Sequence, residues 1–453
     1  MTDMSKIKTK TAIISKIDLK NIDINNIKIN IPSSKSYLNR ALILASMQHG
    51  KTILTNVVEI CDDVSDMIKA LNKIGVKTKI KENKNGKLDI IVFGCGEKFI
   101  QPKDKIINCG LGGTTTRFLL GLSALFDFDI TITAKGKMLK RPINELLEFL
   151  KKMGKDVIFL NTKDHLPVLI KNKNKNKKNV KLIQIDGGES SQFLSSVLMV
   201  ANALNIDEIK VANLVSKSYI KITADVLKKF GITLKHHSCE DGIKYTFDKN
   251  KKYNNKTNNI IQIEQDYSSA SYFFALEYLL GIKNKILNIK QKSSQGDVKF
   301  VKIMEKIDNY KNKKDKNKPL VLNMKNMPDV SMTAMIICCL QNFNTKITGL
   351  KTLKIKECDR LTAMKDELHK IGIATKISSN FDTMTIYGKS NFTLKKHCNI
   401  DTYNDHRIAM CFAILGTIIG NLSIKNAEVV NKSFPNFWQE LEKFNCVKIS
   451  NEL

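Results

Sequence analysis

The stretch RLTAMKDELHKIG, residues 360–372, shows the structural unit from which much of the chain is built. Its apolar residues recur at helical spacing: Leu361, Met364, Leu368 and Ile371. The pattern predicts an amphipathic helix that ends at Gly372 and is followed by an extended run. The same Lys-x-Gly stop occurs at Gly75, Gly154 and Gly231, at a spacing of roughly 75 residues or a multiple of it. The sequence therefore predicts an internally repeated α/β architecture.

The chain is large and strongly basic. It has 453 residues and a formal net charge of +30, from 74 Lys and Arg against 44 Asp and Glu. With 42% hydrophobic residues it can bury a large core, which excludes disorder as the main state. The charge indicates anionic partners, or a drift of composition toward Lys and Asn. Three Lys/Asn-rich tracts are predicted to be surface loops: 171–179, 249–259 and 309–318.

Cysteine usage and the absence of targeting signals narrow the class of protein. The ten cysteines include no Cys-x-x-Cys pair, so no dedicated metal site is expected and the thiols are predicted to be reduced. The N-terminus has no apolar segment of the kind found in secretory signals. The longest apolar helical stretch, residues 408–420, is shorter than the roughly 20 residues that span a bilayer. We expect a soluble, cytoplasmic protein.

Four segments place polar or cationic residues directly before a long apolar helix. A helix start offers free N–H groups and the positive end of the helix dipole. With Lys, Arg, Ser or Thr added, each start can hold an anion, although each one alone also fits an ordinary helix cap. Together they favour a common cleft for a polyanionic small molecule. The segments are 32–40, 109–117, 188–192 and 404–407.

Two further segments supply acids. Glu357 and Arg360 lie one turn apart on a predicted helix face, and Asp329 directly precedes an apolar helix. Taken singly, these patterns also fit a solvated charged helix start and a capping Asp, so the residues alone leave a catalytic role open.

Short motifs continue this pattern along nearly the whole chain. In the first half they are PSSKSYLNRALILAS (32–46), CGLGGTTTRF (109–118), KRPINELLEFLKKMG (140–154), SSQFLSSVLMVA (190–201) and SKSYIKIT (216–223). In the second half they are QDYSSASYFFA (265–275), QGDVKFVKIMEKI (295–307), MPDVSMTAM (327–335), KECDRLTAMKDELHKIG (356–372), YNDHRIAMCFAI (403–414) and KSFPNFW (432–438). In this order the motifs resemble the EPSP synthase family of enolpyruvyl transferases.

The resemblance implies a fold. Members of the family have a two-domain inside-out α/β barrel, and each domain is built from three repeated βαβαββ units. The crossovers between domains would lie near Ile31–Ser33 and Gln262–Glu264. One domain would comprise residues 1–32 and 263–453 and hold mainly the phosphoenolpyruvate-side and acid/base residues. The other would comprise residues 33–262 and hold mainly the shikimate-3-phosphate side.

The resemblance also implies an activity and its residues. The enolpyruvyl group of phosphoenolpyruvate would pass to the 5-hydroxyl of shikimate 3-phosphate through a tetrahedral intermediate, with release of phosphate. The implied catalytic residues are Asp329, Glu357 and Lys35. The implied ligands of shikimate 3-phosphate are Lys35, Ser36, Arg40, Ser190, Ser191, Gln192, Ser216, Tyr219, Asp329 and Lys356. Those of phosphoenolpyruvate are Lys35, Gly113, Arg141, Gln192, Arg360, Arg407 and Lys432.

No metal or organic cofactor is implied by the resemblance. No nucleic-acid or membrane partner is expected, and the chain is expected to act as a monomer. Two positions depart from the family pattern, because Leu111 and Thr352 stand where the family often has Asn. One polar contact to phosphoenolpyruvate and one to shikimate are therefore left open.

Three alternatives remain. The first is the sister enzyme that acts on UDP-N-acetylglucosamine, but that family typically has a reactive Cys shortly before its Arg-Pro, and residues 131–140 contain none. The second is a basic nucleic-acid-binding protein, which would leave Asp329, Glu357 and Asp405 unexplained and lacks a binding motif. The third is an inactive relative, against which the complete set of acids and cations argues.

Overall fold

The chain folds into two compact units. The computed structural model describes residues 9–173, 180–248, 258–282, 287, 289 and 293–451. Unit 1 contains the chain up to Pro32 and again from Asp266 onward, and unit 2 contains Ser33–Gln265. The chain therefore leaves unit 1 once, completes unit 2, and returns.

Unit 2 repeats one βαβαββ arrangement, seen most simply in its middle repeat. The sheet order there is β5-β6-β8-β7. β5 and β6 pair in parallel, whereas β8 pairs antiparallel with both β6 and β7. The bounds in chain order are β5 Ile106–Asn108, α3 Gly113–Leu122, β6 Ile130–Thr133, α4 Asn144–Lys152, β7 Lys155–Phe159 and β8 Val168–Asn172.

The next repeat has the same order, β9-β10-β12-β11. Its elements are β9 Leu182–Asp186, α5 Ser191–Ala201, β10 Glu208–Ala212, α6 Ser218–Lys229, β11 Leu234–Cys239 and β12 Gly242–Phe247. The remaining repeat consists of α1 Lys35–Ser46, β2 His49–Val57, α2 Asp62–Lys73, β3 Lys77–Glu82 and β4 Leu88–Cys95. Its first strand is supplied by the other end of the unit, because β13 (Asn258–Gln262) pairs in parallel with β2.

Unit 1 uses the same arrangement. One sheet has the order β14-β15-β17-β16, and the other has β18-β19-β1-β20, in which the N-terminal strand β1 takes the inner position. The strands are β1 Lys10–Ile14, β14 Leu320–Asn323, β15 Asn344–Thr348, β16 Thr375–Ile377, β17 Thr383–Tyr387, β18 Cys398–Ile400, β19 Leu422–Ile424 and β20 Val447–Asn451. The helices are α7 Tyr267–Leu280, α8 Phe300–Lys311, α9 Ser331–Cys339, α10 Arg360–Lys370, α11 His406–Ile419 and α12 Phe437–Glu442.

The predicted stop at the end of α10 is confirmed. Gly372 has a φ of +81°, and the amide of Ile373 donates to the carbonyl of Leu368 at 2.9 Å, which closes the helix with a left-handed glycine. The predicted Lys/Asn-rich loops are wrong at their edges. Asn172 ends β8, residues 258–259 begin β13, and residues 309–311 form the last turn of α8, because pairing and packing with neighbours override composition. Residues 174–179 and 249–257 lie outside the described part.

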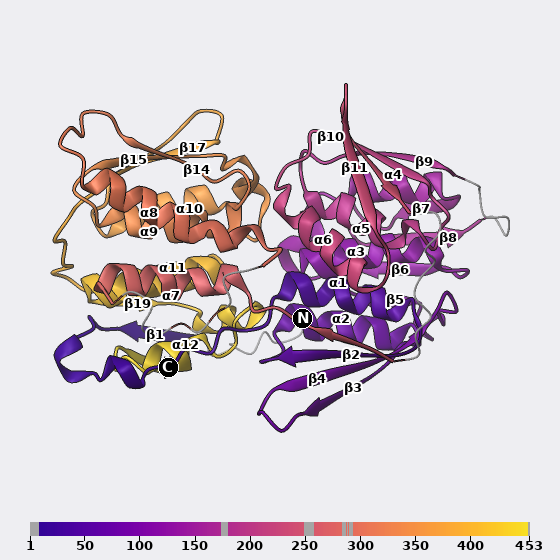
Figure 1. The fold of residues 1–453 in the computed structure, drawn as a ribbon, viewed down its shortest axis with the longest axis horizontal. Helices are drawn as coiled ribbons and strands as arrows, with labels where there is room; N and C mark the ends of the chain where they lie inside the picture. Colours follow the sequence, from indigo (N-terminus) through magenta and orange to yellow (C-terminus); the bar gives the residue numbers. More distant parts are fainter. Residues whose placement is uncertain are drawn as a thin grey trace. The chain divides into compact units, whose positions relative to one another are not determined.

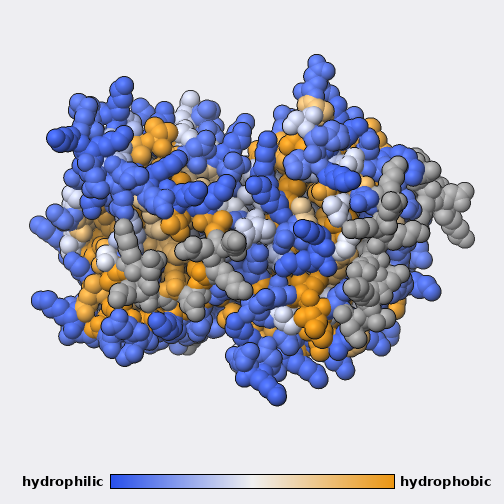
Figure 2. Space-filling view, viewed as in Figure 1, coloured by the Kyte–Doolittle hydropathy of each residue, from blue (hydrophilic) through white to orange (hydrophobic). Residues whose placement is uncertain are grey.

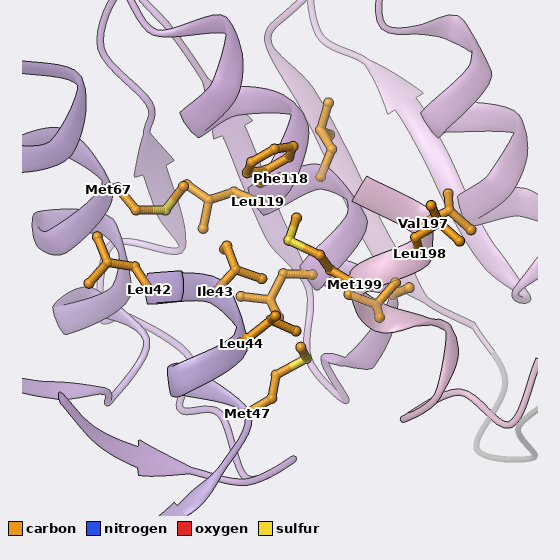
Figure 3. Close-up of a cluster of buried hydrophobic side chains, with 14 of the residues drawn as sticks. Leu42, Ile43, Leu44, Met47, Met67, Phe118, Leu119, Val197, Leu198 and Met199 are labelled. Atoms are coloured by element: carbon orange, nitrogen blue, oxygen red, sulfur yellow. The ribbon is translucent and has the colours of Figure 1, made fainter. Parts of the chain in front are cut away.

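The helices lie inside and the sheets outside, as the family fold predicts. Figure 1 shows α1, α3 and α5 in the interior of unit 2, and α7 and α11 between the β1 sheet and the other helices of unit 1. Every residue of α3 and α9 is buried. The polar side chains that α3 carries are therefore hydrogen-bonded: Thr114, Thr115, Thr116 and Arg117. In Figure 3, Ile43 of α1, Leu119 of α3 and Met199 of α5 lie close together in the core of unit 2.

The visible surface is mainly hydrophilic, with apolar residues gathered in smaller areas (Figure 2). Within the described ranges, no helix combines the length and apolar character needed to cross a membrane.

Replacing Leu119 of α3 by Ala tests the burial of the inner helices. The side chain is fully buried, so the free energy of unfolding is expected to fall by about 2–5 kcal/mol. Leu182→Ala on β9, where 46% of the residue is exposed, serves as the control and should cost less than about 1 kcal/mol. Urea unfolding followed by circular dichroism measures both, and equal losses would contradict the inside-out arrangement.

Candidate active site

In unit 2 the predicted residues gather at the first turns of the inner helices. Lys35 begins α1, Gly113 begins α3, and Ser191 begins α5. Ser190 caps α5, and its hydroxyl accepts a hydrogen bond from the amide of Gln192 at 3.2 Å. The first amides of a helix have no partner within the helix, so these starts are suited to bind anions.

Lys35 is held by an acid that the sequence analysis did not select. Its ammonium nitrogen lies 2.8 Å from Oδ2 of Asp63 on α2, and both side chains are largely buried. Asp63 also packs against the glycine loop, since a Cβ added to Gly112 would lie 2.8 Å from its Oδ1. The loop therefore needs glycine at position 112 to leave room for the carboxylate.

Arg141 lies against the start of α3. A Cβ added to Gly113 would approach its Nη1 to 2.8 Å, so the missing side chain lets the guanidinium come close to the helix start. Leu111, in the same loop, is 50% exposed and places an apolar side chain where the family often has an amide.

Arg117 links three of these segments and was not among the predicted site residues. Its Nη1 donates to Oγ of Ser190 at 3.2 Å and to Oε1 of Gln192 at 2.9 Å. Its Nη2 donates to the carbonyl of Pro142 at 2.8 Å, directly after Arg141. Arg117 thereby fixes the start of α5 relative to the loop that carries Arg141. The sequence signal that could have identified Arg117 is its place in the motif CGLGGTTTRF.

Arg40 is buried within unit 2 and does not lie at its surface. It is 1% exposed, and its guanidinium donates to Thr223 of α6, to Ser195 of α5 and to the carbonyl of Ser36. Burial lowers the pKa of Arg40. Tyr219 joins the same group, because its carbonyl accepts from Arg40 and Thr223, and its amide donates to the carbonyl of Ser216. A direct contact of Arg40 with a substrate stays a prediction.

In unit 1 the predicted acids and cations form one network. Arg360, 1% exposed, contacts three carboxylates: Asp405 at 2.7 Å, Glu357 at 2.8 Å and Asp329 at 3.3 Å. Three more cations join it: Lys356 at 3.5 Å from Asp329, Arg407 at 3.2 Å from Asp329, and Lys432 at 3.1 Å from Glu357. Burial opposes the charge of Arg360, but Asp405, Glu357 and Asp329 outweigh burial and raise its pKa.

Asp405 holds this network together. It is fully buried, it caps α11 by accepting from the amide of Arg407 at 2.8 Å, and it accepts from Nε of Arg360. The thiol of Cys358 lies 3.5 Å from Oδ2 of Asp405, the oxygen that also accepts from Nε of Arg360. Burial, followed by the charge of Asp405, raises the pKa of Cys358, so the thiol stays protonated and inert.

Across the described ranges there is no group of three or more His, Cys, Asp and Glu side chains placed to hold a metal ion. The arrangement can instead bind anions at helix starts and cationic side chains, with two partly accessible carboxylates, Asp329 and Glu357, beside the cations of unit 1.

Comparison with known proteins points to one family. A family model described as EPSP synthase (3-phosphoshikimate 1-carboxyvinyltransferase) matches residues 21–441. A relative in Buchnera aphidicola subsp. Cinara cedri, named 3-phosphoshikimate 1-carboxyvinyltransferase, is 37% identical over 93% of this chain and 96% of its own length. One of the same name in Psychromonas ingrahamii is 34% identical over 92% and 97%.

Solved structures share the fold. EPSP synthase from Acinetobacter baumannii superposes with a TM-score of 0.71 at 21% identity, over 98% of this chain and 100% of that one. The enolpyruvyl transferase NikO from Streptomyces tendae gives a TM-score of 0.70 at 10% identity, with the same coverage. At these identities the likeness concerns the fold alone.

Replacing Arg360 by Leu tests the network of unit 1. The change leaves three carboxylates short of their shared cation, so the protein should lose about 3–5 kcal/mol of stability near pH 7. The deficit should shrink as the pH falls toward about 4, because protonation removes the repulsion. Lys425→Leu in the same unit is the control. The side chains of Lys425 and its partner Asp401 are both nearly half exposed, and we expect a loss of about 0–1 kcal/mol. Thermal midpoints at both pH values decide, and a pH-independent deficit would contradict the charge argument.

Proposed function

Because the chain belongs to the EPSP synthase family, we propose that the two clusters described above carry out the reaction of that family. The protein is a 3-phosphoshikimate 1-carboxyvinyltransferase. It transfers the enolpyruvyl group of phosphoenolpyruvate to the 5-hydroxyl of shikimate 3-phosphate and releases phosphate. That the protein acts as a monomer in the cytoplasm, without nucleic acid, stays part of the proposal.

The substrates set the first requirement, which is compensation of charge. Both carry a phosphate and a carboxylate, so each is a multiply charged anion. We assign phosphoenolpyruvate to Arg360, Arg407 and Lys432 of unit 1, and to Lys35, Gly113, Arg141 and Gln192 of unit 2. We assign shikimate 3-phosphate to Ser36, Arg40, Ser190, Ser191, Gln192, Ser216 and Tyr219, with Lys35, Asp329 and Lys356. Cations and helix starts stabilise the leaving phosphate as its charge develops.

The bonds that change set the second requirement, which is acid/base catalysis. The substrate hydroxyl adds to C2 of phosphoenolpyruvate and must lose a proton, while C3 takes one. The tetrahedral intermediate then expels phosphate, and the proton transfer at C3 runs in reverse. We assign deprotonation of the hydroxyl to Asp329, assisted by the ammonium group of Lys35, and protonation of the carbon to Glu357.

One observation carries this assignment: Asp329 and Glu357 share the guanidinium of Arg360, and each contacts a second cation. Asp329 must be ionised to accept the proton of the hydroxyl, whereas Glu357 must carry a proton before it can deliver one to C3. The cations beside both carboxylates are also the groups that an anionic substrate would attract away, so substrate binding and proton transfer would involve the same side chains.

A phosphate-release assay tests the function. Purified protein receives phosphoenolpyruvate with either shikimate 3-phosphate or UDP-N-acetylglucosamine. We expect phosphate only with shikimate 3-phosphate. Release only with UDP-N-acetylglucosamine would assign the sister activity, and release with neither would favour an inactive relative.

Asp329→Asn tests the assignment of the base. The change keeps size and hydrogen-bonding capacity but removes the proton acceptor, so kcat should fall by about 10²–10⁴-fold while shikimate 3-phosphate still binds. The matched control is Asp359→Asn. Asp359 only caps α10 by accepting from the amide of Thr362, and Asn caps a helix equally well, so activity should persist. Turnover of Asp329→Asn near that of the unsubstituted protein would refute the role.

A further inference from the structure

A short segment before α8 is fastened to the start of α7. The side-chain oxygen of Gln295 accepts a hydrogen bond from the amide of Tyr267 at 3.1 Å. Two residues later, in the 3₁₀ helix Gly296–Lys299, Oδ2 of Asp297 accepts from the hydroxyl of Ser268 at 2.5 Å. Asp297 is only 5% exposed. A buried carboxyl group is costly unless its surroundings compensate for its charge, so its placement requires an explanation.

One face of α7 connects Asp297 with the network of unit 1. Ser268 and Tyr272 lie one turn apart and therefore on the same face of the helix. Ser268 holds Asp297, and the hydroxyl of Tyr272 lies 3.4 Å from Nη1 of Arg407. The same guanidinium nitrogen donates to the backbone carbonyl of Asp329 at 3.1 Å, and Nη2 lies 3.2 Å from the Asp329 carboxylate.

Asp297 shares its buried environment with several charged groups. Burial raises its pKa to about 7, with the negative charge of Asp329 as the next cause. The hydrogen bond from Ser268 and the charge of Arg407 act in the opposite direction, and Asp266 at the start of α7 adds a further upward contribution. The charged groups that act on Asp297 through their electrostatic field include Asp266 on the α7 side, Asp329 on the segment before α9, and Arg407 on α11.

We propose that Asp297 is a positioning residue whose carboxyl group sets how much positive charge the Arg407–Asp329 pair presents to phosphoenolpyruvate. The inference rests on the proposed assignment of Arg407 to that substrate. When Asp297 is protonated, it adds no negative charge to the surroundings of Arg407, and the guanidinium attracts an anion more strongly. When Asp297 is ionised, its negative charge offsets part of the charge of Arg407, and the affinity for phosphoenolpyruvate falls.

A purely structural role for Asp297 would predict that KM for phosphoenolpyruvate does not depend on the charge of this side chain. If Asp297 only fastened the segment to α7, any acceptor for the Ser268 hydroxyl would suffice, and charge would not matter. Asp297→Asn separates the two roles, because the amide oxygen still accepts that hydrogen bond but the side chain cannot ionise. Ser268→Ala is the complementary variant, since it removes the hydrogen bond and leaves the carboxyl group able to titrate.

The experiment measures KM for phosphoenolpyruvate and kcat from pH 6 to 9 for the full-length protein and both variants. In the unsubstituted protein, KM should rise as Asp297 loses its proton around pH 7, by about tenfold more than in Asp297→Asn. The ionisation of the substrate phosphate is common to all three proteins and cancels in the comparison. In Ser268→Ala the rise should move to higher pH, because the lost hydrogen bond favoured the ionised carboxyl group.

Superimposable pH profiles of KM for the unsubstituted protein and Asp297→Asn would overturn the proposal. So would an effect confined to KM for shikimate 3-phosphate. Thermal midpoints at each pH establish that both variants are folded. Failure of the proposed function is a separate result, because the unsubstituted protein would then release no phosphate from phosphoenolpyruvate and shikimate 3-phosphate at any pH.

Discussion

The inner helices are buried on every side, and this constraint determines where charge can lie. A helix such as α3 or α9, buried along its entire length, can carry polar groups only where partners are at hand. Its first turn supplies them, because the leading amides have no partner within the helix and attract negative charge. Lys35, Gln192 and Arg407 all lie in such first turns. In each unit the candidate residues therefore lie where the fold itself places the starts of the inner helices.

Much of the fold and many of the candidate residues could be predicted from the sequence, because the sequence signals for them are local. The Lys-x-Gly stop at Gly372 and its counterparts revealed the repeat, since a left-handed residue at the end of a helix nearly demands glycine. The polar clusters before apolar runs revealed the helix starts. The motif order then named the family, which identified Asp329, Glu357 and the cations as candidates. Arg360 and its carboxylates do lie together in unit 1.

The features that could not be predicted from the sequence depend on contacts between residues that are distant in the chain. That β13 would complete the sheet of β2, and β1 the sheet of β19 and β20, follows from pairing across the chain and leaves no local pattern. Arg40 has the sequence context of a ligand, but the side chains that accept its hydrogen bonds come from α5 and α6. Asp297 follows a Gln-Gly pair that resembles any turn, and only its contact with Ser268 on α7 reveals its surroundings. Burial and long-range partners are tertiary properties.

The network of unit 1 explains why acids lie among cations that are meant to bind anions. Asp329, Glu357 and Asp405 face Lys356, Arg360, Arg407 and Lys432, so three negative charges offset most of four positive ones before substrate arrives. Without them, three buried cations and the partly exposed Lys356 would repel one another and destabilise the fold. On the proposed assignment, an incoming phosphate or carboxylate competes for these cations. A carboxylate that loses its cation becomes a stronger base, because its ionised form is no longer stabilised. Asp405, fully buried and bound to a helix start, keeps its partners, whereas Asp329 and Glu357 are more accessible. Binding of the anion would thus activate the two carboxylates that the chemistry needs and leave the structural one unchanged.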